Sequence, residues 1–244
     1  MLTKNEIKYI QSLYQKKQRE EEKLFIAEGP KLAEELINSS IEIVNIYATN
    51  NWLRSIANTN LVFTEVSDAE LTKISNLQTP NEVVVVARQQ QSLPEPILKD
   101  QITLVLDGIQ DPGNFGTIIR IADWFGITQL VCSNDCVDLY NPKVVQSTMG
   151  SITRVNCWYK DFASWSPTVS LDIYGALLEG ENVYEVGKVN EGLLVIGNES
   201  KGIREPFLSK IQKPVTIPKI GGAESLNAAV ATGIILGCLV MNKQ

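Results

Sequence analysis

The chain has 244 residues, 44% of them hydrophobic, which is enough to form a sizeable core in one large or two small domains. It contains no histidine, and this excludes Ser-His-Asp or Cys-His nucleophilic catalysis and any histidine-ligated metal. The formal net charge of −6 argues against a protein that coats nucleic acid by bulk electrostatics, although it is compatible with a local basic patch.

The first part of the chain, residues 1–95, predicts a small α/β domain. Thr3 and Glu6 form a capping box, and Ile7, Ile10 and Leu13 follow at helical spacing. This charged helical start is unlike a signal peptide, so we expect a cytoplasmic protein. The further expected elements are a strand over residues 24–29, a helix over 30–38, a strand over 41–49, a helix opened by the capping box of Ser67 and Glu70, and a buried strand over NEVVVVAR, residues 81–88.

The segment QQQSLPEPILKD, residues 89–100, is polar, contains two prolines and lacks a period, which predicts a linker to a second domain, residues 101–244. The expected segments of that domain are ITLVLDG, GNFGTIIRIADWFG, TQLVCS, NPKVVQSTMG, LDIYGALL, LLVIGN, PVTIPK and an apolar closing helix. Their strand-and-helix rhythm predicts a mostly parallel sheet with helices on both faces and ligands at the carboxyl ends of its strands. Dinucleotide-fingerprint glycines and a phosphate-binding P-loop are both missing, which disfavours dehydrogenases and P-loop NTPases.

The closing segment is apolar from Ala228 to Met241. It is shorter than the roughly 20 residues that a membrane span requires, so we expect a buried helix. Residues 224–227 must end one element and begin this helix within a very short stretch, which frees backbone N–H groups to hold a ligand. Four cysteines without CxxC spacing lie in apolar surroundings, which favours reduced core thiols over a metal or disulfide site.

Polar residues gather in segments that follow predicted strands. Asn114 is expected at a helix start, with Gly113, Gly116 and Arg120 on roughly one side of that helix. Gly197-Asn198-Glu199 follows a second strand. Without side chains at the two helical glycines, a ligand can approach beside the guanidinium.

A further polar segment supplies Ser225 and Asn227. Taken singly, these two are ordinary helix caps, Arg120 an ordinary surface ion-pair residue and Glu199 an ordinary turn residue.

Together, in this order and spacing, the segments resemble the SpoU family of RNA 2′-O-ribose methyltransferases, within the SPOUT class. The three family motifs correspond to residues 114–120, 197–199 and 217–227, and VVQSTMGSITRVN also resembles the family. Residues 1–90 resemble the ribosomal-protein-like RNA-binding domain that many members carry. Departures from the family pattern bear on the identity of the substrate more than on the type of reaction; they are Ser200 in place of glycine, Thr153 in place of an aromatic residue, and Ala228-Ala229 in place of Val-Ser.

The resemblance implies a deep trefoil knot in the C-terminal domain, S-adenosylmethionine as methyl donor, a homodimeric active site and no metal. The implied catalytic residues are Arg120, Asn114, Glu199, Ser225 and Asn227. The implied donor-binding residues are Gly197, Ile217, Leu226, Ala176, Asn198, Pro218 and Ala228. Gly221 and Gly222 would permit the sharp turn of a knot loop.

The implied reaction is methyl transfer to a ribose 2′-hydroxyl, with ribosomal RNA favoured over transfer RNA as substrate. The family assigns activation of the hydroxyl to Arg120, but a guanidinium is a poor base. Arg120 would therefore act either as that base or as a group that orients an RNA phosphate or stabilises the forming alkoxide. The alternative function is an RNA-binding assembly factor of the same class that has lost catalysis.

Overall fold

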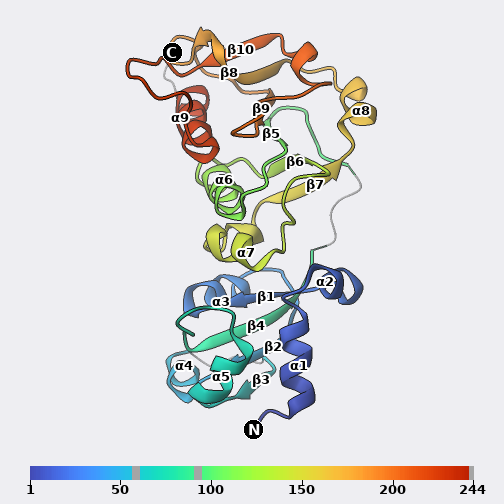
Figure 1. Ribbon diagram of the computed structural model, residues 1–244, viewed down its shortest axis with the longest axis vertical. Helices are drawn as coiled ribbons and strands as arrows, with labels where there is room; N and C mark the ends of the chain where they lie inside the picture. The colour runs from blue at the N-terminus through green and yellow to red at the C-terminus, as the bar shows by residue number, and fades with distance from the viewer. Residues whose placement is uncertain (57–60, 91–94, 242–244) are drawn as a thin grey trace. The chain divides into compact units, whose positions relative to one another are not determined.

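The computed structural model of the chain describes residues 1–56, 61–90 and 95–241 (Figure 1). Its internal contacts divide it into an N-terminal unit, residues 1–91 with 138–153, and a C-terminal unit, residues 92–137 with 154–244. The sequence places residues 138–153 in the second domain, whereas they pack within the N-terminal unit. Residues 91–94 of the expected linker lie outside the described residues.

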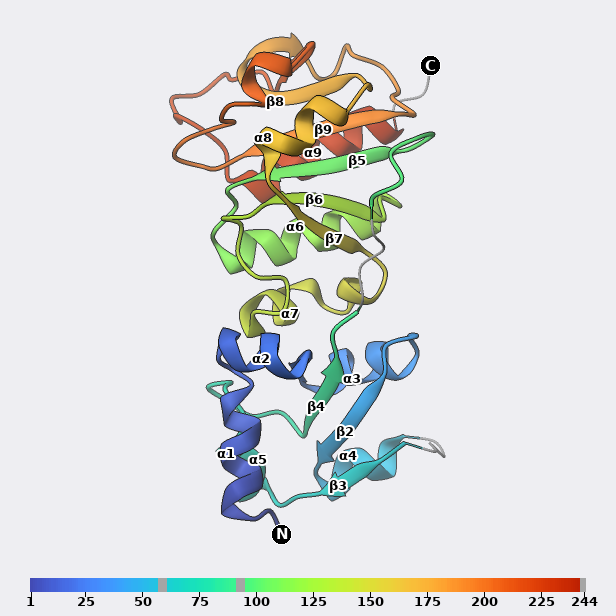
Figure 2. The same cartoon turned by 90° about the vertical axis from the view of Figure 1, so that its right-hand side faces the viewer.

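The N-terminal unit is built on a sheet of order β1-β4-β2-β3, of which β2, β3 and β4 are labelled in Figure 2. Its elements are α1 (Lys4–Ser12), α2 (Lys16–Glu22), β1 (Leu24–Glu28), α3 (Pro30–Ile37), β2 (Ile43–Ala48), α4 (Asn50–Ser55), β3 (Phe63–Glu65), α5 (Asp68–Ile74), β4 (Val83–Arg88), α7 (Pro142–Thr148) and the 3-10 turn η1 (Ser151–Thr153). β4 pairs antiparallel with both β1 and β2. Its residues 83–87 are buried, as the continuous β-branched run predicts.

Both predicted capping boxes of this unit are confirmed. The Thr3 and Ser67 hydroxyls accept the backbone N–H of Glu6 and Glu70, whose carboxylates return a bond to the cap. The helices that they open, α1 and α5, pack through residues such as Ile10 on β1, β2 and β4. The elements α2, α4 and β3 were not predicted, because α2 is almost entirely charged and the other two are very short.

The segment 138–153 is fixed in the N-terminal unit by side chains distant in sequence. The Tyr140 ring lies 4.9 Å from that of Phe25 on β1. Arg19 of α2 is 2% exposed and its Nη2 lies 2.6 Å from Oδ2 of Asp138. Its other terminal nitrogen donates to the carbonyl oxygens of Leu13 and Tyr14. This buried ion pair joins positions 119 residues apart, a relation that no local pattern predicts.

The C-terminal unit contains a sheet of order β10-β8-β9-β5-β6-β7, in which every recorded pairing is parallel. Its elements are β5 (Ile102–Asp107), α6 (Pro112–Trp124), β6 (Gln129–Ser133), β7 (Asn156–Lys160), α8 (Phe162–Trp165), η2 (Ser166–Thr168), β8 (Ile173–Asn182), β9 (Gly192–Gly197), η3 (Leu208–Lys210), β10 (Lys213–Thr216) and α9 (Ala228–Met241). The central strand β5 is buried throughout, which is typical of a parallel sheet covered on both faces.

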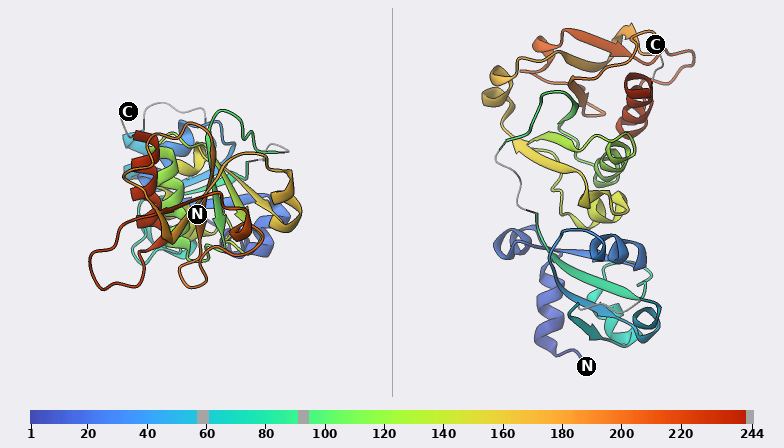
Figure 3. Two further views of the ribbon diagram at one scale, coloured as in Figure 1. Left: turned by 90° about the horizontal axis from the view of Figure 1, so that it is seen from above. Right: turned by 180° about the vertical axis from the view of Figure 1, so that it is seen from behind.

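Helices cover both faces of this sheet, as predicted. α6 and α9 lie side by side on one face (Figures 1 and 3), where Gly233 and Gly237 of α9 face Ile121 of α6 and Phe125, the residue that follows it. The other face is covered by α8 and by Phe207, which packs edge-on against Phe162.

The expected alternation of strand and helix fails in the last third of the chain. Among the described residues, β8, β9 and β10 follow one another without an intervening α-helix. The strand expected over PVTIPK ends at Thr216, and β7 was not expected at all. No helix in the described part of the chain is long and apolar enough to cross a membrane.

Candidate active site

A cavity of about 820 Å³ lies beside the carboxyl-terminal parts of β9 and β10. Residues 176–179 of β8, the loop after β9, residues 217–226 and the start of α9 complete its wall. The expected donor-binding residues all line it, namely Ala176, Gly197, Asn198, Ile217, Pro218, Leu226 and Ala228. Their roles stay predictions, but the structure brings residues of β8, β9, α9 and the segment after β10 to one cavity.

The loop after β9 turns back on itself beside Gly197. The N–H of Asn198 donates to the carbonyl of Gly202 at 3.1 Å, and the N–H of Gly202 donates to the carbonyl of Asn198 at 2.8 Å. Gly202 has φ of +65°, a left-handed conformation that favours glycine. The Asn198 side chain holds the same turn by accepting the N–H groups of Ser200 and Lys201.

Asn114 connects the three motifs of the sequence. Its Nδ2 donates to Oε1 of Glu199 at 2.6 Å, and its Oδ1 accepts from Nδ2 of Asn227 at 2.8 Å. These bonds join residues 85 and 113 positions apart. Asn114 does not itself start α6, because the helix begins at Pro112 and the Asp111 side chain caps it by accepting the N–H of Asn114.

Asn227 has both of the roles considered for it. Its Oδ1 accepts the N–H groups of Ala229 and Val230, so it caps α9, while its amide nitrogen donates to Asn114. Ser225 is exposed and lines the cavity together with Glu199. The short polar segment before α9 therefore caps a helix, carries a motif residue and forms part of a cavity wall.

Arg120 lies apart from the cavity lining, on α6. Its side chain is exposed, and within the described residues it has no hydrogen bond or ion pair. Gly116 of α6 is buried, so the approach of a ligand beside Arg120 at that glycine stays a prediction. The guanidinium is available to a molecule that approaches α6 from solvent.

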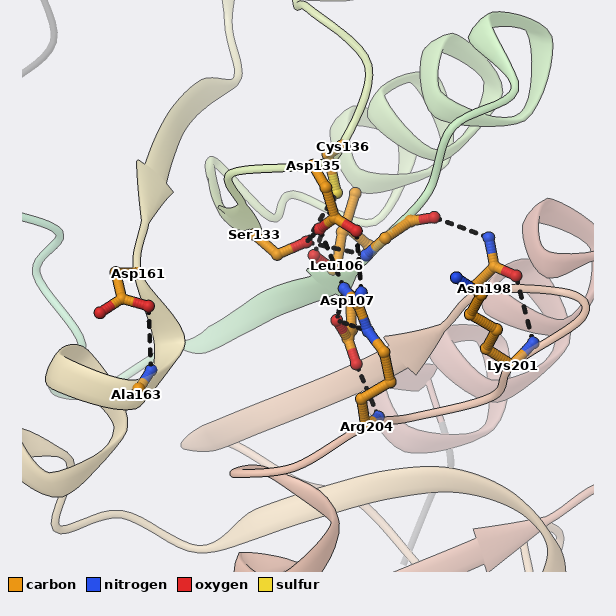
Figure 4. A network of polar contacts seen from close by, with 11 residues as sticks. Leu106, Asp107, Ser133, Asp135, Cys136, Asp161, Ala163, Asn198, Lys201 and Arg204 are labelled. Carbon is orange, nitrogen blue, oxygen red and sulfur yellow. Dashed lines mark hydrogen bonds and ion pairs between the residues drawn. The ribbon is translucent and has the colours of Figure 1, made fainter.

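Sequence reasoning missed a network beside this site (Figure 4). The Arg204 side chain donates to the buried Asp107 carboxylate through Nε at 2.9 Å and through Nη2, and to Asp135 through Nη1 at 2.8 Å. Ser133 Oγ donates to Asp135 at 2.6 Å and accepts the N–H of Gly108 at 2.8 Å. The one local signal was Asp107 itself, a carboxylate that ends a wholly buried strand.

Hydrogen bonds from Arg204 lower the pKa of Asp135 to about 2, and the two carboxylates together raise the pKa of Arg204. Asp135 therefore stays negatively charged and Arg204 positively charged at neutral pH. In the described part of the chain no group of three or more His, Cys, Asp or Glu side chains is placed to hold a metal ion.

Comparisons with known proteins agree with this geometry. The model of the SpoU rRNA Methylase family matches residues 101–237, and that of the MRM3-like substrate binding domain matches residues 4–85. The chain is 28% identical to the 23S rRNA (guanosine(2553)-2′-O)-methyltransferase RlmP of Bacillus subtilis, over 94% of each chain.

Two solved structures are similar over nearly the whole chain. One, from Porphyromonas gingivalis and assigned to the TrmH family of RNA methyltransferases, is 35% identical with a TM-score of 0.86 and 98% of both chains covered. The other, an AdoMet-bound rRNA methyltransferase from Sinorhizobium meliloti, is 28% identical with a TM-score of 0.85, covering 98% of this chain and 95% of that one.

Proposed function

Since this chain belongs to the SpoU rRNA Methylase family, we propose that it transfers a methyl group from S-adenosylmethionine to a ribose 2′-hydroxyl of ribosomal RNA. The observation that carries the proposal is the pair of hydrogen bonds from Asn114 to Glu199 and Asn227, which gathers three motifs beside one cavity. The family match and the AdoMet-bound relative support the choice of donor.

The cavity is suited to this donor in size and chemistry. Its volume of about 820 Å³ is within the usual range for small-molecule sites. Apolar side chains such as Ile196 and Ile235 line it together with polar groups. The backbone at Gly197, Ile217 and Leu226 would hold the adenosyl part. S-adenosylmethionine supplies a sulfonium-bound methyl group, which an oxygen nucleophile attacks in line.

Arg120 would work on the acceptor side of the reaction. Its position outside the donor cavity, exposed on α6, supports contact with RNA rather than with the donor. There it would orient a phosphate or stabilise the developing alkoxide of the attacking ribose. Asn114, Glu199 and Asn227 would fix the start of α6 relative to the donor.

The purified protein should bind S-adenosylmethionine or S-adenosylhomocysteine without any added cation, because backbone and uncharged groups supply most of the cavity wall. Calorimetry in the presence of a chelator measures this binding, and transfer of a labelled methyl group to ribosomal RNA measures the reaction. Absence of both heat and thermal shift at millimolar ligand would contradict the proposal.

Two other functions predict different outcomes in the same assays. A transfer RNA methyltransferase would label transfer RNA in preference to ribosomal RNA. An inactive assembly factor would bind RNA without transferring the methyl group.

The match of residues 4–85 to a substrate binding domain supports an RNA-binding role for the first domain, residues 1–95, in either case. Mapping 2′-O-methyl sites in cells with and without the gene would identify the nucleotide.

The protein should form a homodimer through α9 and the adjoining end of α6. α9 has no charged residue, yet Val230 and Met241 on it are 51% and 68% exposed. Trp124 at the end of α6 is 84% exposed. A second copy would remove this apolar surface from water. Light scattering should give twice the 27.0 kDa chain mass, and Val230→Asp should halve it; a monomeric wild-type protein would contradict the proposal.

The trefoil knot expected in residues 101–244 remains a proposal. The meeting of the loop after β9 with residues 217–226 at one cavity supports it. Pulling the unfolded chain from both ends would test it, because a knotted chain reaches a shorter final length than an unknotted one.

A further inference from the structure

The loop after β9, residues 198–204, is bonded at its start to Gly108, just after β5, and at its end to Asp107, the last residue of β5. At its start, Asn198 Nδ2 donates to the carbonyl of Gly108 at 2.7 Å. At its end, the backbone N–H of Arg204 donates to Oδ2 of Asp107 at 2.7 Å. Strand register prepares this arrangement, because Asp107 pairs with Gly197 across β5 and β9.

The Arg204 side chain extends this attachment to the end of β6. Its planar fork bridges Asp107, at the end of β5, and Asp135, in the turn after β6 (Figure 4). Ser133 Oγ completes the network, because it donates to Asp135 and accepts the N–H of Gly108. The ends of three neighbouring strands are therefore fixed by one guanidinium.

This network differs from an ordinary surface ion pair. The Asp107 side chain is 4% exposed, so its charge requires a partner. Asp135 is 42% exposed, and an ion pair of that kind adds little to stability. The Asp135 carboxylate orients the guanidinium, because Nη1 and Nη2 donate to its two oxygens in a bidentate contact, whereas Nε and Nη2 both donate to one oxygen of Asp107.

The network holds together two segments that contribute residues to the candidate active site. Glu199 and Ile203 of the attached loop line the donor cavity. Gly108 precedes the start of α6 by four residues, and α6 carries Asn114 and Arg120. The bond between Asn114 and Glu199 depends on the relative placement of these two segments.

We propose that Arg204 is a positioning residue, which through Asp107 and Asp135 holds the loop wall of the donor cavity in register with the start of α6. This inference rests on the proposed methyl transfer. Arg204 itself contacts neither donor nor RNA in this role. It fixes the position of the donor cavity relative to Asn114 and Arg120 of α6, which act on the acceptor side.

Arg204→Lys is the central test. Lysine keeps a positive charge beside the buried Asp107, so the protein should fold, but it lacks the fork that reaches both carboxylates. We expect donor Kd to rise at least tenfold and kcat at saturating donor to fall at least tenfold, with RNA affinity unchanged. Asp135→Asn removes only the exposed half of the network and should shift both quantities in the same direction, by less.

Arg88→Gln is the matched control, since it breaks another bidentate arginine–carboxylate pair, with Glu42, in the N-terminal unit. It should leave donor Kd and kcat unchanged. A merely stabilising role for Arg204 predicts that the lysine variant recovers wild-type Kd and kcat well below its melting temperature. That recovery, or wild-type values throughout, would overturn the proposal.

Hydrogen–deuterium exchange separates this inference from the proposed function. In the donor-free protein, Arg204→Lys should exchange amides of residues 198–203 and 108–114 at least tenfold faster, with the N-terminal unit unaffected. If the wild-type protein binds no donor, the proposed function fails, and exchange alone decides the role of Arg204. Faster local exchange then supports the positioning role, and unchanged exchange refutes it.

Discussion

Arg120→Ala is expected to lower methyl transfer by at least about 10²–10³-fold, the scale seen when one transition-state donor is removed. Affinity for S-adenosylmethionine should stay within a few fold of the wild-type value. The separation follows from the structure, because Arg120 is exposed on α6 while the cavity is lined by segments of β8, β9, β10 and α9.

Arg120→Lys distinguishes the two chemical roles left open for this side chain. Lysine loses its proton more readily than arginine, so a base role predicts appreciable activity that rises with pH. Lysine lacks the planar fork that grips a phosphate through two bonds, so an orienting role predicts activity nearly as low as that of the alanine variant. We expect the second result.

Single-turnover methyl transfer at several pH values, with donor binding measured in parallel, tests both variants. Thr117→Ala provides the control on the same helix, because Thr117 is also exposed on α6 but carries no charge. Wild-type rates in Arg120→Ala would exclude a catalytic role for this residue. A lysine variant whose rate climbs with pH would restore the base mechanism.

Local patterns predicted the elements whose signals are contained within the element itself. The capping boxes at Thr3 and Ser67 located α1 and α5, and the uninterrupted β-branched run located β4. α2 was missed because its charged residues show no apolar face; its buried member, Arg19, is paired with Asp138. The affiliation of residues 138–153 with the N-terminal unit depends on such distant contacts.

The candidate site shows the same limit. Residue types alone are compatible with ordinary structural roles for Asn114, Glu199 and Asn227. Only the family resemblance predicts that the three belong to one site. The fold shows what neither the residue types nor the resemblance predicts, namely that Asn114 is hydrogen-bonded to both Glu199 and Asn227. Arg204 and Asp107 lie 97 positions apart, and nothing in either local sequence indicates the pairing.

Gly197 is expected to be the position where the smallest substitution has the largest effect on donor binding. A Cβ at this position would lie 2.2 Å from the carbonyl carbon of Gly202 and 2.4 Å from the backbone nitrogen of Ile203. Both are backbone atoms, so no side-chain rotation relieves the overlap. The turn closed by Asn198 and Gly202 would have to open, and this turn forms a wall of the cavity.

Gly197→Ala should therefore weaken S-adenosylmethionine binding at least 100-fold, or by about 2.7 kcal/mol in binding free energy. Gly222→Ala is the matched control, because Gly222 lies next to the cavity lining, its φ is not left-handed and a Cβ there meets no atom within 4 Å. Its donor Kd should stay within about threefold of the wild-type value, since only open space receives the added methyl group. Calorimetry on both variants, with melting temperatures to confirm folding, makes the comparison. A backbone overlap of this size has to displace the turn at Gly197. Equal donor affinities in the two variants would therefore show that this turn does not shape the donor site.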